Sequence, residues 1–289
     1  MVNLLVIALL VAQSAGPTMA PTKNVRLPNK AGSLKFAVIG DSGQTGGGQD
    51  AVAAQLAKWR ANFPFEFVLM MGDNLYGTER PHDYEKKFSV PYKPILDAGV
   101  KFYAALGNHD DAGQINYKLF NMDGKKYYTF KAKTDVRFFA IDSNYVDSKQ
   151  LEWLEKELTA SGSDWKIAFF HHPLYSSGAT HGSADAQREL LEPVFLKHHV
   201  NVVIAGHEHF YERLKPQKGI AYFILGSSAK LRKGDLRKSA LTAYGNDSDY
   251  AFMLVEIDGD NLHFQTISDK GVTLDSGVVN RPKATTDSK

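Results

Sequence analysis

The sequence predicts an α/β domain, and three observations support this prediction. From Leu34 onward, short apolar runs alternate with glycine-rich or polar breaks and amphipathic stretches. Most of the apolar runs are dense in Val, Ile and Phe, without polar alternation, which is typical of buried strands. The 289-residue chain is 43% hydrophobic and 23% charged, an ordinary globular composition that excludes intrinsic disorder.

Strands are predicted wherever an apolar run is bounded by turn-forming residues. In chain order they cover Leu34–Ile39, Phe67–Met71, Phe102–Leu106, Tyr127–Phe130, Val136–Ile141, Trp165–Phe170, Val200–Ala205, Ala221–Leu225, Phe252–Ile257 and Leu262–Ile267. The last two flank a turn at residues 258–261 whose Asp-Gly-Asp-Asn sequence predicts a hairpin at the end of the domain.

Helices are predicted where the pattern is amphipathic. They cover Asp50–Arg60, Gln150–Leu158 and Ala184–His198. Asp50 is the expected N-cap of the first helix, and Asp147 and Gln150 have the spacing of a capping box at the second. No linker divides the pattern, so a single domain is expected over residues 34–280, with a linker at 21–33 and a polar tail at 281–289.

The N-terminus resembles a signal peptide at residues 1–20. Leu4–Ala12 is an apolar run, and the small residues Ala15, Gly16 and Ala20 follow it. From this resemblance we expect export to the periplasm or the medium. Because residues 2–20 contain no Lys or Arg, a buried first strand is the alternative. No other apolar run reaches the 18 or so residues of a membrane-spanning helix, so we expect no stable membrane insertion after signal removal.

The net charge and the cysteine content limit which partners and which metal ligands are possible. The formal net charge is +2, with no dense basic stripe, which argues against a nucleic-acid partner. The chain has no cysteine, so any bound metal must be held by histidine, carboxylate, amide or phenol groups. The segment of residues 43–49 is rich in glycine, but it lacks the Gly-Lys-Ser/Thr ending of a nucleotide-binding loop. We therefore interpret it as a flexible loop at the edge of the site.

Five predicted strands end in a residue that can bind a metal, four of them directly after a glycine. The motifs are Gly40-Asp41, Gly72-Asp73, Gly107-Asn108, Phe170-His171 and Gly206-His207-Glu208-His209. Each motif alone is more often a turn, a loop or a core histidine. Because the carboxyl ends of parallel strands form the ligand crevice of an α/β sheet, their joint occurrence predicts a metal site.

This order of motifs, over residues 35–210, resembles the calcineurin-like metallophosphoesterase superfamily. Within it, the variant resembles the purple acid phosphatases, for two reasons. Gly43 stands where many relatives have a ligand histidine, and Tyr76 follows Asp73 by three residues, where those phosphatases bind ferric iron through a phenolate. The alternative for Tyr76 is an aromatic packed under a loop. The resemblance implies a four-layer α/β/β/α sandwich of two mixed β-sheets flanked by helices.

The resemblance also implies two metal ions. The first, Fe(III), would be held by Asp41, Asp73, Tyr76 and His209. The second, which would be Zn, Fe(II) or Mn(II), would be held by Asp73, Asn108, His171 and His207. His171 is the inferred ligand because the family motif is His-x-Pro and Pro173 sets the register, which leaves His172 in the outer shell. Carboxylate and phenolate oxygens suit a trivalent ion.

The implied activity is hydrolysis of a small-molecule phosphate monoester, in which metal-bound hydroxide attacks phosphorus. His109 and His181 occupy places where the family keeps outer-sphere histidines, so they are the candidate catalytic residues, although His181 could also be a surface-loop histidine. Glu208 is expected to point away from the ligands. Two alternatives stay open: a phosphodiesterase or nucleotide pyrophosphatase on the same scaffold, and a non-hydrolytic iron-binding or redox protein. The sequence gives no oligomeric state.

Overall fold

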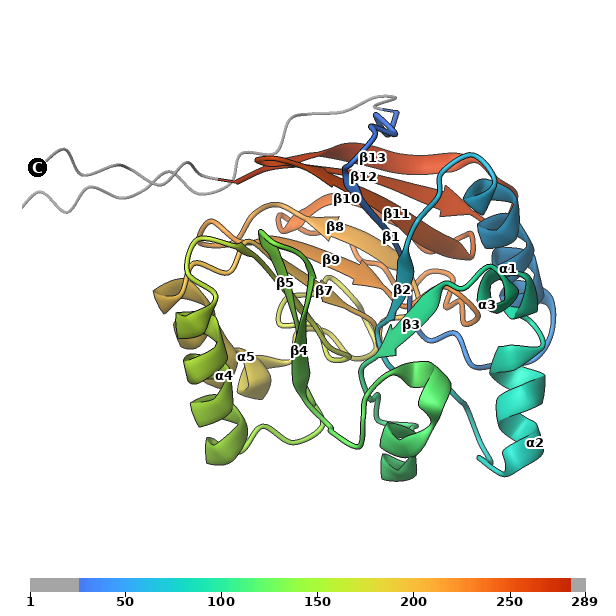
Figure 1. Cartoon of the computed structure of the whole chain (residues 1–289), viewed down its shortest axis with the longest axis horizontal. Coiled ribbons are helices and arrows are strands. Elements are labelled where there is room, and N and C mark those ends of the chain that lie inside the picture. Colours follow the sequence, from blue (N-terminus) through green and yellow to red (C-terminus); the bar gives the residue numbers. More distant parts are fainter. Residues whose placement is uncertain (1–25, 282–289) are drawn as a thin grey trace, which may run out of the picture.

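The computed structural model describes residues 26–281, so the predicted leader at residues 1–20 and residues 282–289 of the predicted tail lie outside the described residues. Two mixed β-sheets pack face to face, and helices cover the outer side of each sheet (Figure 1). The predicted four-layer sandwich is therefore confirmed.

The first sheet has six strands in the order β13-β12-β11-β1-β2-β3. Their bounds are β1 (Leu34–Ile39), β2 (Phe67–Met70), β3 (Lys101–Ala104), β11 (Ala251–Asp258), β12 (Asn261–Ser268) and β13 (Thr273–Asn280). Strands β1, β2 and β3 run parallel, and β11 joins β1 antiparallel. The carboxyl ends of β1, β2 and β3 therefore meet at one edge of this sheet.

The second sheet has seven strands in the order β10-β8-β9-β7-β6-β5-β4. Their bounds are β4 (Tyr128–Lys133), β5 (Val136–Ala140), β6 (Trp165–Phe169), β7 (Val202–Ala205), β8 (Tyr211–Leu214), β9 (Ala221–Leu225) and β10 (Thr242–Asn246). Strands β5, β6, β7 and β9 are parallel, whereas β4, β8 and β10 pair antiparallel at the two sides.

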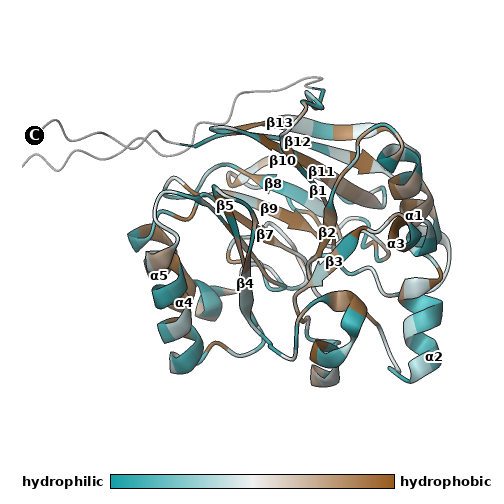
Figure 2. Cartoon of the chain, viewed as in Figure 1, coloured by the Kyte–Doolittle hydropathy of each residue, from teal (hydrophilic) through white to brown (hydrophobic). Residues whose placement is uncertain are grey.

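The helices divide between the two sheets. Their bounds are α1 (Gly47–Arg60), α2 (Pro81–Tyr84), α3 (Lys93–Asp97), α4 (Ser148–Ala160) and α5 (Asp185–Lys197), with a π-helical turn at Glu85–Ser89 and 3₁₀ turns at Ala112–Asn116 and Lys118–Phe120. Helices α1 and α3 lie beside the first sheet, and α4 and α5 lie beside the second (Figure 1). Figure 2 shows mixed teal and brown colouring along these helices, as expected when one face is buried and the other is exposed.

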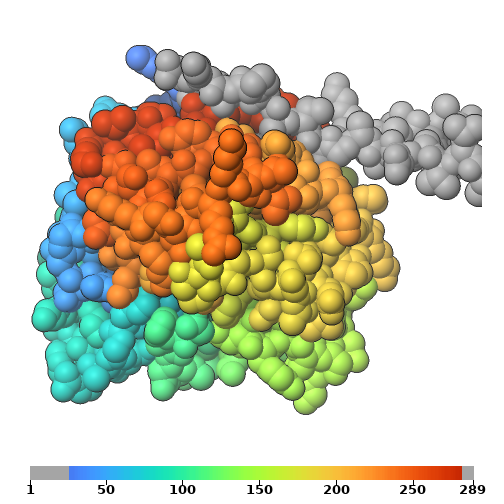
Figure 3. Space-filling model, turned by 180° about the vertical axis from the view of Figure 1, so that it is seen from behind, coloured from blue at the N-terminus to red at the C-terminus, as the bar shows by residue number. Residues whose placement is uncertain are grey.

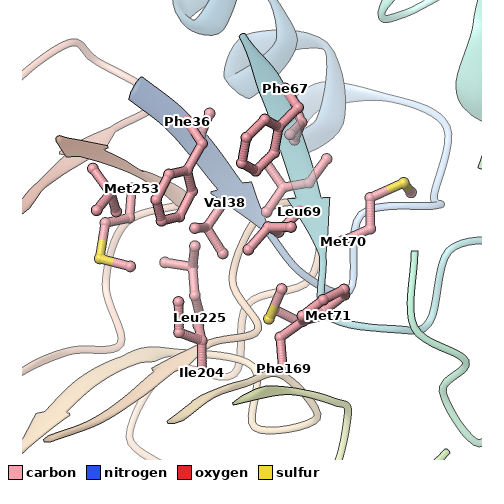
Figure 4. Close-up of a cluster of buried hydrophobic side chains, with 14 of the residues drawn as sticks. Phe36, Val38, Phe67, Leu69, Met70, Met71, Phe169, Ile204, Leu225 and Met253 are labelled. Atoms are coloured by element: carbon pink, nitrogen blue, oxygen red, sulfur yellow. The ribbon is translucent and has the colours of Figure 1, made fainter. Parts of the chain in front are cut away.

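The main core fills the space between the two sheets. Figure 4 shows Phe36 and Val38 of β1 on one side of this core, and Ile204 of β7 and Leu225 of β9 on the other. The Phe36 ring meets the Phe138 ring of β5 edge-on, with centroids 5.2 Å apart. Burying one such side chain contributes about 1.5–3 kcal/mol, so this layer holds the sheets in a fixed relation.

A second core lies under α4 and α5. Leu154 and Leu158 of α4, with Leu191 and Phe195 of α5, are buried in one cluster against the outer face of the second sheet. The structure confirms only half of the capping box predicted for α4. Asp147 does cap α4, since its carboxylate accepts a hydrogen bond from the backbone N–H of Gln150 at 2.8 Å. The Gln150 side chain, however, bonds the backbone of Asp142 in place of completing the predicted box.

Some expected boundaries are wrong. Helix α1 begins at Gly47 after a Gly46 cap, so Asp50 lies within its first turn and is not the N-cap. Strands β8, β10 and β13 were not predicted. The hairpin of β11 and β12 does form, with Asp258 opposite Asn261, but it does not end the domain because β13 adds to β12.

The described part of the predicted linker lies against β11. The backbone N–H groups of Asn29 and Lys30 and the Ser33 hydroxyl all donate to the buried Glu256 carboxylate, at 2.6 to 2.7 Å. Among residues 26–281, no helix is long and apolar enough to cross a membrane.

Candidate metal centre

The backbone at the strand ends aims the predicted ligands into one region. Asp41, Asp73 and His207 have φ of 52°, 49° and 70°, in the left-handed region that residues with a Cβ rarely adopt. Each of these residues directly follows a glycine, and each glycine lies one or two positions beyond the end of a strand. Such conformations cost on the order of 1–3 kcal/mol and persist where the surrounding structure enforces them, which is frequent at functional sites.

Two of the glycines permit close approach of backbones. A Cβ on Gly40 would lie 2.1 Å from the Leu225 carbonyl oxygen of the opposite sheet, and a Cβ on Gly107 would lie 2.2 Å from the Asp73 backbone nitrogen. These glycines let strand ends lie in contact, and the contact between Gly40 and Leu225 brings the ends of both sheets together.

One cluster combines Asp41, Asp73, Tyr76 and His209. The Tyr76 hydroxyl lies 3.0 Å from Asp41 Oδ1 and 3.2 Å from His209 Nε2, and His209 Nε2 lies 3.4 Å from Asp41 Oδ1. Ligand atoms of Asp41, Asp73 and His209 all lie within 4.8 Å of one another. These are the residues inferred for the first ion.

The adjoining cluster combines Asp73, Asn108, His171 and His207. His171 Nε2 lies 3.0 Å from Asn108 Oδ1, 3.1 Å from His207 Nδ1 and 3.4 Å from Asp73 Oδ1. On the other side of the ring, His171 Nδ1 lies 2.9 Å from the Met71 carbonyl oxygen. Donation of the Nδ1 proton to this carbonyl leaves the Nε2 lone pair facing the cluster, an arrangement typical of metal-binding histidines.

The electrostatics of the clusters fit bound cations. Burial raises the pKa of Asp41 well above its usual range, and the neighbouring Asp73 carboxylate adds to this shift. Burial lowers the pKa of His209 to about 4, and burial with His171 and His172 nearby lowers that of His207 to about 2. Neutral imidazoles and two adjacent carboxylates offer lone pairs and negative charge, so cations between these donors would relieve the repulsion.

The predicted outer-sphere histidines both border the clusters. The His109 ring lies over the Tyr76 ring with centroids 4.9 Å apart, and its backbone N–H donates to Asp73 Oδ1 at 3.0 Å. The His181 ring lies 4.3 Å from the His207 ring. His181 is also exposed on its loop, so its catalytic role stays a prediction beside the surface-loop alternative.

His172 also reaches the site. Its ligand nitrogen groups with those of His171 and His207, so the structure alone offers His172 as a further donor. Its Nδ1 lies 2.9 Å from the Ser143 hydroxyl, and its backbone N–H donates to the same hydroxyl. Ser143 thus fixes the ring orientation.

Glu208 points away from the metal donors, as expected from its place between two ligands. It is fully buried, and its carboxylate faces the loop that carries His181. Burial raises the pKa of Glu208 to about 7.

Sequence reasoning missed two charged residues near the centre. Asp110 accepts hydrogen bonds from the backbone N–H groups of Leu75 and Gly107, which ties the Tyr76 segment to the Asn108 segment. Its position in the Gly-Asn-His-Asp motif is a signal that could have identified it. The Lys230 ammonium lies 4.3 Å from the Tyr76 ring centre, and no spacing in the sequence indicates this contact.

An open pocket of about 480 Å³ adjoins the second cluster. It is lined by Leu106, Gly107, Asn108, Asp110, Ala112, Lys126, Asp142, Asn144, Tyr145, His172 and Gln187. Tyr145 is 75% exposed at its rim. The pocket therefore leads from solvent to Asn108.

The calcineurin-like phosphoesterase family model matches residues 34–211 of this chain, which is more than half of its length. The chain belongs to this family. Over most of its length it is also related to purple acid phosphatases: purple acid phosphatase 7 of Arabidopsis thaliana is 25% identical, with 84% of this chain and 88% of the plant protein covered.

The fold also occurs in solved structures of other proteins. GAP50, described as the anchor in the inner membrane complex of Plasmodium, has a TM-score of 0.76 at 21% identity, covering 88% of this chain and 90% of that chain. Purple acid phosphatase PPD1 of yellow lupin has a TM-score of 0.74 at 19% identity, covering 89% of this chain and 55% of the lupin chain.

Proposed function

We propose that the protein is a phosphomonoesterase of the purple acid phosphatase type, which uses two metal ions. The observation that carries the proposal is the pair of adjoining donor clusters, which share Asp73 and lie where the ends of both sheets meet. Carboxylate, phenol, imidazole and amide groups form these clusters, and this donor set suits one hard trivalent ion and one borderline divalent ion. Phosphate esters are the substrates that the family implies.

The residues divide between the ions as follows. Asp41, Asp73, Tyr76 and His209 would hold Fe(III), and Asp73, Asn108, His171 and His207 would hold Zn, Fe(II) or Mn(II). Tyr76 supports the choice of iron because its hydroxyl lies within 3.2 Å of donors on Asp41 and His209. A packed aromatic without a ligand role would not need a hydroxyl at that position.

When bound, the two ions would polarise the phosphoryl oxygens and lower the pKa of a water molecule, which would supply the nucleophile. The chain supplies the proton for the leaving oxygen. His109 is the first candidate, because its ring lies beside Tyr76 at the edge of the centre, and His181 beside His207 is the second. The pocket beside Asn108 gives the leaving group a place outside the donor clusters.

The metals are tested by measuring metal content and the visible absorption of purified wild-type protein and Tyr76→Phe. The expected result is two metals per chain including iron, with a broad visible band that disappears in the variant because the phenolate donor is lost. Two divalent ions in a colourless protein would contradict the purple acid phosphatase type and leave the broader phosphoesterase assignment.

The reaction is tested by comparing the hydrolysis of a phosphomonoester with that of a phosphodiester and a pyrophosphate. A preference for the monoester is expected, with kcat lower by about 10²-fold or more in His109→Ala at unchanged metal content. Faster hydrolysis of the diester or pyrophosphate would favour that alternative. An iron-loaded protein that hydrolyses none of the three substrates would favour the non-hydrolytic alternative.

A further inference from the structure

We propose that Glu208 is a positioning residue, which holds the loop of residues 176–182 so that His181 stays against His207. The functional part of this inference rests on the proposed phosphomonoesterase activity. The structural part does not, because it concerns only the contacts that fix the loop.

The Glu208 carboxylate binds the loop at both ends. Glu208 Oε1 accepts a hydrogen bond from the Gly182 backbone N–H at 2.7 Å and one from the Ser176 hydroxyl at 3.1 Å. The Ser176 hydroxyl in turn accepts from the Gly178 N–H at 2.9 Å. One carboxylate oxygen therefore joins the beginning of the loop to the residue directly after His181.

The loop backbone lies directly on this carboxylate. A Cβ on Gly178 would lie 2.1 Å from Glu208 Oε1 and 2.7 Å from Oε2, so only glycine leaves room for the contact. The Glu208 side chain is fully buried, and Oε2 has no hydrogen-bond partner among the described residues. A buried carboxylate is costly without strong hydrogen bonds, so the bonds to the loop are the main compensation for burying it.

The outer side of the loop is held by the segment after β9. The Ala179 N–H donates to the Asp235 carbonyl oxygen at 2.8 Å, and the Thr180 hydroxyl donates to the Asp235 carboxylate. Gly178 also pairs with Leu236 in an isolated antiparallel bridge. On the face shown in Figure 3, the yellow surface of the chain near residue 180 adjoins the orange surface near residue 235. The loop is therefore held on two sides, by Glu208 on the inner side and by Asp235 and Leu236 on the outer side.

The position of Glu208 connects the loop to the metal donors. His207 and His209 flank it in the chain, and their rings face the clusters while the glutamate faces the opposite way. The same three residues therefore present two metal donors and fix the loop that brings His181 within 4.3 Å of the His207 ring. Movement of the loop would displace His181 without removing a metal donor.

The contact is tested first by hydrogen exchange in the metal-loaded protein. Glu208→Ala should speed exchange of the Gly182 amide by about tenfold or more, because its acceptor is lost, while Glu208→Gln, which keeps an acceptor oxygen, should show a smaller increase. Glu256→Ala is the matched control. Glu256 is also a buried carboxylate that accepts from two backbone N–H groups, but it does so at Asn29 and Lys30. Unchanged exchange at residues 176–182 in Glu208→Ala would overturn the proposal.

The role in turnover is tested by a double-mutant cycle on a phosphomonoester. Glu208→Ala should lower kcat about tenfold with two metals still bound, and should lower it no further in a His181→Ala background. Independent losses that multiply, or loss of metal from Glu208→Ala, would overturn the positioning role. If Glu208→Ala does not fold, Gly178→Ala disturbs the same contact from the loop side. An inactive wild-type protein would contradict the proposed function, while the exchange experiment would still decide the contact.

Discussion

At the scale of single residues, the centre depends on positions that tolerate no added atom. Gly107 precedes Asn108, and its α-carbon faces the backbone and carboxylate of Asp73. Asp73 itself has a left-handed conformation and lies in both donor clusters. The position of Asp73, which both clusters share, therefore depends on Gly107 at the end of a different strand. Gly107 itself has no direct chemical role.

Gly107→Ala is expected to lower both stability and metal content. The new Cβ would lie 2.2 Å from Asp73 N and from Asp73 Oδ1, so Asp73 must move. Overpacking of this kind costs about 1–3 kcal/mol of unfolding free energy. Denaturant unfolding and metal analysis provide the measurement. Gly47→Ala in α1 is the control, since nothing lies within 4 Å of its added Cβ; equal behaviour of the two variants would contradict the prediction.

At the scale of elements, β8 joins the two sheets through polar side chains. Arg213 and Tyr211 of β8 both donate to the Asp275 carboxylate of β13, with Arg213 Nε at 2.7 Å and the Tyr211 hydroxyl at 2.8 Å from Oδ2. Arg213 and Asp275 side chains are only 12% and 3% exposed. The Tyr-Glu-Arg sequence after the last metal motif therefore has an architectural role.

Asp275→Ala should destabilise the protein by about 3–5 kcal/mol, because it leaves a buried guanidinium without its partner. The variant is expected to keep its metal content at low temperature, since Asp275 lies outside both donor clusters. Thermal unfolding gives the measurement. Asp258→Ala removes an exposed ion pair with Lys30 and should change stability by less than about 1 kcal/mol. Similar losses in both variants would contradict the buried role of Asp275.

The sequence predicted the strands that are rich in apolar residues and missed three that are less so. Strands β1 and β9 have the predicted bounds because all of their residues are buried and all but Lys35 are apolar or aromatic. Strand β8 contains the buried Glu212, and β13 contains buried Asp275 and Ser276, so neither matches an apolar pattern. Their polar groups are satisfied by residues distant in the chain, such as Ser177 and Thr242 on Glu212, and no local pattern records such contacts.

The candidate site was more predictable than the sheet edges. Each expected donor follows a strand, and strand direction decides where the donors converge, so motif order alone places them together. The contacts of Glu208 with its loop and of Lys230 with Tyr76 depend on how separate loops fold back over the centre. Spacing along the chain does not contain that information.

At the scale of the whole molecule, the donor clusters connect the two sheets. Asp41, Asp73 and Asn108 follow strands of the first sheet, and His171 and His207 follow strands of the second. Ions held by both sets would stabilise the packing of one sheet on the other, in addition to the apolar core between them.

Metal removal should therefore lower global stability. A ligand present at about 1,000 times its dissociation constant adds about 4 kcal/mol to the folded state, so chelation is expected to lower Tm by several degrees. Calorimetry before and after dialysis against a chelator, followed by addition of the metal, gives the measurement. An unchanged Tm after complete metal loss would contradict a linking role for the centre.

The distribution of donors along the chain has a consequence for biosynthesis. The inferred ligands extend from Asp41 to His209, and β11, which pairs directly with β1, follows later still. A nascent chain that has emerged only as far as β6 presents carboxylates but lacks the three imidazoles of His171, His207 and His209. Complete ion capture must therefore wait until most of the chain has left the ribosome, and the ions available where folding finishes will decide which metals the protein carries.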